Sequence, residues 1–270
     1  MSEIASEISW TVLGSSSGIP SPTRNCSGHL LKFSDSLTLF DCGSGVTKAF
    51  LQRSFEPDCL EHIFISHTHS DHISDLPLLV QLLYNLKRNK PLYLYLPQEA
   101  ITSFASFLSA CYLFREKFSF DLRLRPIKEI QSPGNGNISV RAILNNHLSK
   151  AAAQIKEFDY PNRMESYSFL ITLQDRVRVL YSADIGSLVD ITPYLGALDF
   201  LVLETFHIDL GQLEQSLQAN PVKRVLLTHY TDQDREKLEN YIARSLHRQC
   251  LSLAEDGMTV NLGTADIALT

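Results

Sequence analysis

The segment Ile63–Ile73, IFISHTHSDHI, places three histidines and an aspartate within six residues, directly after an apolar run that predicts a buried strand. Imidazoles crowded at a strand end repel one another when protonated, and their ring nitrogens lose water when they are buried. In an extended tail, His67 and His69 point to the same side and can bind one ion. Asp71 and His72 enter the following turn and can bind a second ion. The segment therefore predicts a metal site.

The ligand types narrow the choice of metal. Imidazole and carboxylate ligands together suit zinc, with manganese and iron as alternatives. The segment contains no cysteine, which argues against a closed structural zinc site. We therefore expect divalent ions that take part in chemistry.

Length and composition limit the class of protein. The 270 residues are 44% hydrophobic, which is enough for a sizeable core, and we expect one domain spanning residues 1–270. No apolar stretch approaches the roughly 18 residues of a membrane span. The acidic N-terminus MSEIASEISW lacks the basic region of a signal peptide. We expect a protein that neither binds membranes nor is exported.

Cysteine usage and charge add two further limits. The five cysteines are scattered and never form a C-x-x-C pair, which argues against a disulfide framework and favours a reducing cytoplasm. The net charge of −6 argues against a protein whose whole surface binds nucleic acid, although a local basic patch can coexist with it.

Strand-like runs precede amphipathic stretches in both halves of the chain. Helical spacing predicts helices over 46–55, 76–88 and 99–114, and a last helix that carries Leu238, Tyr241, Ile242 and Leu246. Two sheets packed face to face, with helices on both outer faces, would cover the apolar faces of these elements. The expected fold is a four-layer αββα sandwich of the α/β class.

Further ligands are expected at other strand ends, because one short segment cannot complete two ion sites. His147, Asp184 and His229 each follow a strand-like run, in the same structural position as the opening cluster. The remaining candidates are expected to be structural or at the surface: His29 in the N-terminal hairpin, His62 beside the sheet, and His247 inside the last helix.

The ordered motifs resemble those of the metallo-β-lactamase fold superfamily. These are FDCGSG around Asp41, SHTHSDH, the lone His147, YSADIG around Asp184 and LLTHY around His229, and the resemblance runs from about Trp10 to about Leu262. Within that superfamily, LGSSSGIPSPTRNCSGHLL is similar to the N-terminal signature of the ribonuclease Z branch. This branch contains tRNA 3′-processing endonucleases and related phosphodiesterases.

The resemblance implies a ligand set for two divalent ions, zinc first. The first ion would be held by His67, His69 and His147, the second by Asp71, His72 and His229, and Asp184 would bridge them. Two cations about 3.5–4 Å apart lower the pKa of a shared water molecule toward neutrality and stabilise both the attacking and the leaving oxygen of a phosphoryl group.

The resemblance also implies roles beside the ligands. Asp71 would orient the nucleophile as well as bind metal. Asp41 would orient a ligand imidazole, with a turn cap as the alternative. Glu204 and His207 match the acid motifs that protonate the leaving alkoxide, although they stand three residues apart where a longer segment separates the endonuclease motifs.

Substrate signals are weaker. Arg24, in the loop SPTRNCSG, could bind a phosphate or lie in a solvated turn. The basic and aromatic segment Leu113–Lys128 could be a substrate lid or a solvated strand face. SPGNGN at 132–137 is short enough for a turn.

The sequence has no long Gly/Pro-rich arm of the kind that binds tRNA in ribonuclease Z. A small or cyclic phosphodiester is therefore the expected substrate. The alternatives are precursor tRNA, a thioester or lactone, and a non-catalytic binding member of the fold. A homodimer is also expected from the resemblance.

Overall fold

The computed structural model describes residues 8–132 and 137–263. The chain divides into two compact units. Unit 1 consists of Met1–Pro126 and Glu255–Thr270, and unit 2 consists of Ile127–Ala254. The expectation of a single domain over residues 1–270 stays a prediction. Most of the predicted turn at 132–137 and the acidic residues 1–7 lie outside the described residues.

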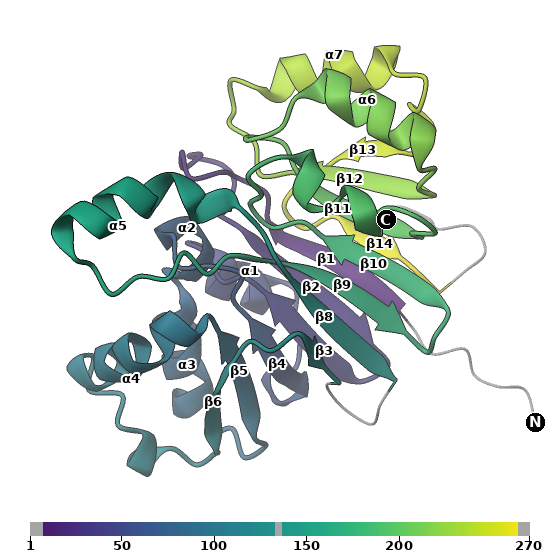
Figure 1. Ribbon diagram of the computed structural model, residues 1–270. Coiled ribbons are helices and arrows are strands. Elements are labelled where there is room, and N and C mark those ends of the chain that lie inside the picture. The colour runs from purple at the N-terminus through teal and green to yellow at the C-terminus, as the bar shows by residue number, and fades with distance from the viewer. Residues whose placement is uncertain (1–7, 133–136, 264–270) are drawn as a thin grey trace, which may run out of the picture. The chain divides into compact units, whose positions relative to one another are not determined.

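Unit 1 is built on a mixed sheet with the strand order β14-β1-β2-β3-β4-β5-β6 (Figure 1). Its strands are β1 (Ile8–Gly14), β2 (Gly28–Phe33), β3 (Ser36–Phe40), β4 (Leu60–Phe64), β5 (Leu92–Leu96), β6 (Leu122–Pro126) and β14 (Thr259–Asn261). Its helices are α1 (Val46–Gln52), α2 (Ser70–Ile73), α3 (Leu76–Asn85) and α4 (Ile101–Ala110), with short 3₁₀ turns at Pro57–Cys59, Gln98–Ala100 and Arg115–Lys117. Strands β3 to β6 are parallel, so their carboxyl ends share one edge of the sheet.

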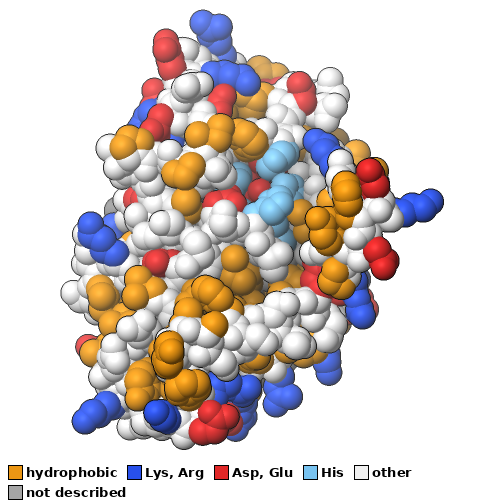
Figure 2. All heavy atoms as spheres, turned by 90° about the vertical axis from the view of Figure 1, so that its left-hand side faces the viewer, with side chains coloured by type: hydrophobic (Ala, Val, Ile, Leu, Met, Phe, Trp, Pro, Cys, Tyr) orange, Lys and Arg blue, Asp and Glu red, His pale blue; other side chains and the backbone are white. Residues whose placement is uncertain are grey.

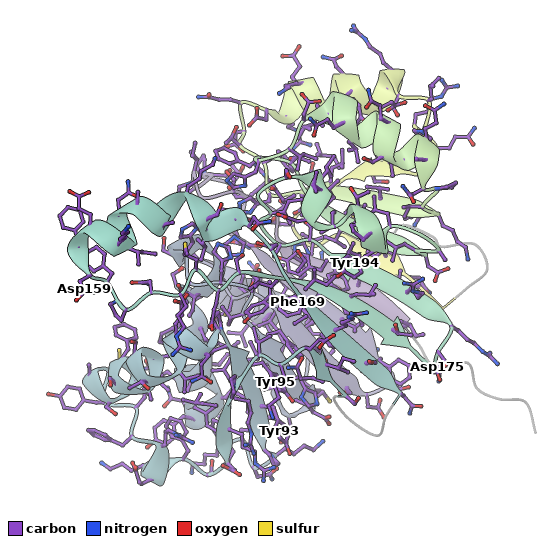
Figure 3. The ribbon with its side chains drawn as sticks, in the orientation of Figure 1. Tyr93, Tyr95, Asp159, Phe169, Asp175 and Tyr194 are labelled. Atoms are coloured by element: carbon purple, nitrogen blue, oxygen red, sulfur yellow. The ribbon has the colours of Figure 1, made fainter. Side chains whose placement is uncertain are left out.

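Alternation along the strands of unit 1 gives the sheet two apolar faces. Leu39, Ile63 and Leu94 belong to the core that also contains buried side chains of α1, α3 and α4. Their neighbours in sequence point the other way and form a row of stacked rings. Phe64 lies 4.3 Å from Tyr95, centroid to centroid, and Tyr95 projects from β5 as Figure 3 shows. This aromatic row stiffens the strands that end at the histidine segment.

The basic and aromatic segment of unit 1 forms an edge strand. Phe118 and Phe120 stack with centroids 5.1 Å apart, and both pack against the core of the unit. Arg123 and Arg125 project from β6 opposite Tyr93 and Tyr95 of β5. Phe118 and Phe120 therefore stabilise the fold, and a role of the segment as a substrate lid stays a prediction.

Unit 2 is built on a second mixed sheet with the order β13-β12-β11-β10-β9-β8-β7. Its strands are β7 (Ile130–Gln131), β8 (Ile138–Leu144), β9 (Tyr167–Leu173), β10 (Val177–Tyr181), β11 (Phe200–Glu204), β12 (Arg224–Thr228) and β13 (Leu251–Leu253). Its helices are α5 (Ala152–Phe158), α6 (Leu210–Ala219) and α7 (Arg235–Arg244), with 3₁₀ turns at His147–Ala151, Leu188–Asp190 and Thr192–Tyr194. Leu213 and Leu217 of α6 pack into the core of this sheet.

The expected α/β fold with two helix-covered sheets is confirmed, and so are the structural positions of two histidines. Trp10 Nε1 donates a hydrogen bond to His29 Nδ1 over 3.3 Å within the N-terminal hairpin. His62 is buried on β4 and stacks on Tyr93, with ring centroids 5.2 Å apart.

The predicted last helix is too long. Helix α7 ends at Arg244, so Leu246, which is 83% exposed, and His247 lie beyond it. Glu214 of α6 accepts hydrogen bonds from Ser245 Oγ and from the Leu246 backbone N–H. Because these bonds hold the chain in an extended conformation at Ser245, the helical spacing that Leu246 continues in the sequence has no helix to support it.

Within the part of the chain that the structure describes, no helix combines the length and apolar character needed to cross a membrane.

Candidate metal centre

The histidine segment of unit 1 begins where two parallel strands end together. Asp41 follows β3, and Ser66 and His67 follow β4. The backbone N–H of Asp41 donates to the carbonyl of Phe64 over 2.8 Å, which joins the two strand ends. The fold thus brings Asp41 to the segment from 25 residues earlier in the chain.

Asp41 is a buried carboxylate that organises the segment. Its oxygens accept hydrogen bonds from the Ser66 backbone N–H over 2.7 Å and from Ser66 Oγ over 3.0 Å. His72 Nδ1 lies 2.8 Å from Asp41 Oδ2. Such a bond fixes the orientation of the imidazole and leaves Nε2 to face a ligand site. Asp41 adopts a left-handed backbone conformation with φ of 60°, which aspartate tolerates better than most residues.

The four candidate ligands of unit 1 form two close pairs. Ligand atoms of His67 and His69 lie within 4.8 Å of each other, as do those of Asp71 and His72. The rings of His67 and His72 are 4.2 Å apart between centroids. His67 and His72 are buried, whereas His69 is exposed. Histidine side chains, pale blue in Figure 2, accordingly reach the surface.

Gly43 supports this segment in a way that the sequence did not reveal. A β-carbon at position 43 would overlap the carbonyl oxygen of Asp71. The neighbouring Cys42 N–H donates to the carbonyl of His72 over 2.8 Å. Only glycine permits this close approach of two backbones. The motif FDCGSG contains the signal, but nothing in its letters shows which partner Gly43 meets.

The candidate ligands of unit 2 come from three separate strands. Asp184 follows β10 and His229 follows β12, and both strands run parallel to the intervening β11. His147 follows β8 from the antiparallel part of the sheet. His147 Nε2 lies 3.6 Å from Asp184 Oδ2, and His229 Nε2 lies 3.1 Å from Asp184 Oδ1. The fold of unit 2 therefore places one carboxylate between two imidazoles.

Two polar residues that the sequence did not single out tie these loops together. Asn145 Nδ2 donates to the carbonyl of Asp184 over 3.0 Å, and Asn145 Oδ1 accepts from the His147 N–H over 3.1 Å. Asp190 accepts from Gly186 N–H over 2.9 Å and from Asn146 Nδ2 over 2.7 Å. Each side chain thus bridges the loop of His147 and the loop of Asp184. In the sequence, only the turn-forming residues around Asn145 and Asp190 hinted at this role.

Glu204 and His207 form a hydrogen-bonded pair in unit 2. Glu204, buried at the end of β11, accepts from the His207 N–H over 2.9 Å and lies 3.2 Å from His207 Nδ1. His207 Nδ1 is also 3.9 Å from Asp184 Oδ2, and the ring is 4.8 Å from that of His147. The compressed spacing therefore still brings His207 to the candidate ligands of its unit.

The surroundings of His207 favour its protonated form. Burial opposes protonation, but the hydrogen bond to Glu204 and the charges of Glu204 and Asp184 outweigh it, so the pKa of His207 is raised. Its side chain is 25% exposed, which leaves the ring accessible to a substrate.

Arg24 lies in a buried network of unit 1. Its Nη1 donates to the carbonyl oxygen of Ser15 over 3.2 Å and to Ser15 Oγ over 3.3 Å. Asp256 accepts from the Ser15 and Asn25 backbone N–H groups beside it. The side chain is 8% exposed, and contact of Arg24 with a substrate phosphate stays a prediction.

The chemistry of these donors fits divalent ions. Both units present imidazole nitrogens together with carboxylate oxygens, and none of the described candidate ligands is a thiol. Neutral imidazoles and ionised carboxylates bind zinc, manganese and iron.

The chain resembles known proteins in sequence and in fold. The chain is 33% identical over 159 residues to ribonuclease Z of Prochlorococcus marinus subsp. pastoris, a match that covers 56% of this chain and 50% of the relative. It therefore spans about half the length of that relative.

Solved structures agree on the fold. The short form of human tRNase Z, ELAC1, matches with a TM-score of 0.71 at 19% identity, over 95% of this chain and 100% of that one. The metallo-β-lactamase fold protein YhfI of Bacillus subtilis matches with a TM-score of 0.69 at 21% identity, over 94% and 99%. The chain therefore has the α/β sandwich of the metallo-β-lactamase fold. The sequence model of the family described as anti-Pycsar protein Apyc1 matches residues 8–250 of this chain. The chain therefore belongs to that family.

Proposed function

We propose that the protein is a metal-dependent phosphodiesterase that cleaves a small or cyclic phosphodiester. The Glu204–His207 pair carries this proposal. An alkoxide is a poor leaving group that needs a proton, whereas a thiolate leaves without one. The imidazole of His207, which is held by Glu204 and lies beside the candidate ligands of unit 2, suits the alkoxide.

The ligand roles follow the family resemblance. His67, His69 and His147 would hold one ion, Asp71, His72 and His229 a second, and Asp184 would be shared. Zinc is the proposed metal, with manganese and iron as alternatives. Bound ions of this kind supply Lewis-acid charge for the phosphoryl oxygens and lower the pKa of water.

Each remaining side chain has a defined task. Asp41 holds His72 through Nδ1, which would leave Nε2 free to bind an ion. Asp71 accepts a hydrogen bond from the attacking water and orients it. His207, held at Nδ1 by Glu204, donates the proton on Nε2 to the leaving oxygen.

A second candidate function is endonucleolytic processing of tRNA. The ribonuclease Z relatives favour it, but they match only in about half of their length. Between His147 and β9, unit 2 contains only a 3₁₀ turn, the short helix α5 and an extended stretch, and this favours the small substrate. A homodimer and a reducing cytoplasmic location belong to the same proposal, and all five cysteines are free.

The test compares substrate classes on one metal-loaded preparation. We expect 3′,5′-cyclic nucleotides, which leave as an alkoxide that His207 can protonate, to be cleaved faster than a thioester, which leaves as a thiolate. Precursor tRNA cut at its 3′ end with higher kcat/KM would favour the second candidate. A faster thioester reaction would contradict both. Light scattering tests the dimer.

A further inference from the structure

One loop of unit 1 is held at both ends by a single carboxylate. This serine loop, residues 15–25, connects β1 to β2, and Asp256 lies in the turn before β14. Asp256 Oδ1 accepts hydrogen bonds from the Ser15 backbone N–H over 2.9 Å and from Ser15 Oγ over 2.8 Å. Asp256 Oδ2 accepts from the Asn25 backbone N–H over 2.6 Å. The far end of the chain therefore anchors the serine loop.

Further hydrogen bonds give the serine loop a fixed shape. The Ser16 N–H donates to the carbonyl of Asn25 over 2.9 Å, which closes the loop at its base. Ser16 Oγ donates to the Ile19 carbonyl over 3.2 Å, and Ser17 Oγ accepts from the Ile19 N–H over 3.3 Å. Both serine side chains are buried. The position of the loop tip at Gly18 is therefore set by the bonds at the base.

The tip of the serine loop lies against the carboxylate of Asp71. A β-carbon at Gly18 would lie 3.3 Å from Asp71 Oδ2 and 3.7 Å from Asp71 Oδ1, so the carboxylate or the loop would have to move by a few tenths of an ångström. The backbone of Gly43 meets the carbonyl oxygen of Asp71 from another direction. The side chain of Asp71 is only 12% exposed. Asp71 is thus enclosed between the Gly43 backbone and the tip of the serine loop.

We propose that the serine loop, anchored by Asp256, fixes the position of the Asp71 carboxylate for the reaction. The inference rests on the proposed function, in which Asp71 orients the attacking water. That task depends on placement, because a displacement of about 1 Å can lower a rate about 10²-fold. Asp256 is therefore a positioning residue that acts through Asp71. Gly18 transmits its effect, because glycine lets the loop tip approach the carboxylate this closely.

Two variants disturb the serine loop at different points. Asp256→Ala removes the bonds to the base of the loop. Gly18→Ala keeps those bonds and brings a β-carbon against Asp71, and alanine suits its backbone, which is not left-handed. We expect each to lower kcat by about 10- to 100-fold and to leave KM within about threefold, as when a group that acts in the transition state is displaced. Gly196→Ala is the matched control, because a β-carbon there meets nothing within 4 Å.

A double-mutant cycle separates positioning from a general loss of structure. In an Asp71→Asn background, Asp256→Ala should change kcat by less than about twofold, because the group that it positions is already lost. The substrate is whichever ester the parent cleaves fastest. Equal losses of kcat in both backgrounds, or parent-like kcat values for both loop variants, would overturn the proposal. If urea unfolding shows that Asp256→Ala does not fold, the same cycle with Gly18→Ala decides.

A spectroscopic measurement separates this inference from the proposed function. With cobalt(II) in place of the proposed zinc, the visible absorption of the bound ion reports its ligands and needs no substrate. Asp256→Ala and Gly18→Ala should shift the spectrum toward that of Asp71→Asn, whereas Gly196→Ala should leave it unchanged. Parent-like spectra of both loop variants would contradict the positioning role. A parent that shows these shifts but cleaves no ester would refute the phosphodiesterase and leave the role of Asp256 intact.

Discussion

The two units assemble their candidate ligands in opposite ways. Unit 1 takes all four from the six residues His67–His72, whereas unit 2 takes three from loops that follow β8, β10 and β12. The local set needs one segment to be shaped correctly, and Asp41 does much of that through Ser66 and His72. The dispersed set needs three strands in register and bridges between their loops.

Because of this difference, residues that connect loops should matter more for metal binding in unit 2 than in unit 1. In unit 2, Asn145 and Asp190 connect loops that lie about 40 residues apart in sequence. A lost bridge there frees one ligand relative to another, and metal affinity depends on that relative placement. Four substitutions test the comparison, from the largest expected effect to the smallest.

Asp184→Ala should have the largest effect. Asp184 lies between His147 and His229 and is the proposed shared ligand, so its loss should remove at least half of the bound metal and abolish hydrolysis. Metal content by elemental analysis and initial rate should be measured on the same samples. Asp175→Asn is the control, because Asp175 is exposed in the hairpin between β9 and β10 (Figure 3). Full activity of a metal-free preparation of either protein would contradict the metal assignment.

Asp71→Asn separates catalysis from metal binding within unit 1. An amide oxygen can still bind metal weakly, but it no longer orients the nucleophile as a carboxylate does. We expect much of the metal to remain and the rate to fall by about 10²–10⁴-fold. His247→Ala, beyond the end of α7, should stay within a few-fold of the parent. Near-normal activity of Asp71→Asn with its metal retained would assign the orienting role to another group.

The same contrast explains what could be read from sequence. The histidine segment revealed its chemistry because its ligands are local and periodic, and the strand ends at His147, Asp184 and His229 could be found by analogy with it. Asn145, Asp190 and Gly43 were missed because their importance depends on partners up to about 45 residues away. The last helix was predicted too long because Leu246 continues the helical spacing of apolar residues. The hydrogen bond from the Leu246 N–H to Glu214, which holds the chain outside the helix, could not be seen in the sequence.

Asn145→Ala should weaken the dispersed set. It removes the bonds to the Asp184 carbonyl and to the His147 N–H while leaving every candidate ligand in the chain. We expect metal affinity to fall by about 10- to 100-fold, as is typical when a group that positions a ligand is lost. Competition with a chelator measures this affinity, and excess metal should restore much of the rate. Asn162→Ala, at an exposed position, is the matched control. An unchanged affinity would mean that the strands alone position these loops.

The smallest effect concerns His62, which supports the sheet of unit 1 and binds no metal in this scheme. Burial lowers the pKa of His62 from 6.5 to about 4, because the charged imidazole loses water in its place beside Tyr93. Folding therefore favours the neutral ring, and its contribution to stability is complete above pH 6.5 and is lost as the pH falls toward 4. His62→Phe keeps a stacked ring but cannot be protonated. Between pH 7.5 and pH 4.5, the parent should lose about 2–3 kcal/mol more of its free energy of unfolding than the variant does. Urea unfolding of both proteins with a chelator present measures this difference, and taking the difference cancels the titration of the shared candidate ligands. If the free energies of unfolding of the parent and the variant changed equally with pH, the imidazole of His62 would be solvated in the folded protein. The support for the strands that lead to the histidine segment would then come from the stacked aromatic rings alone.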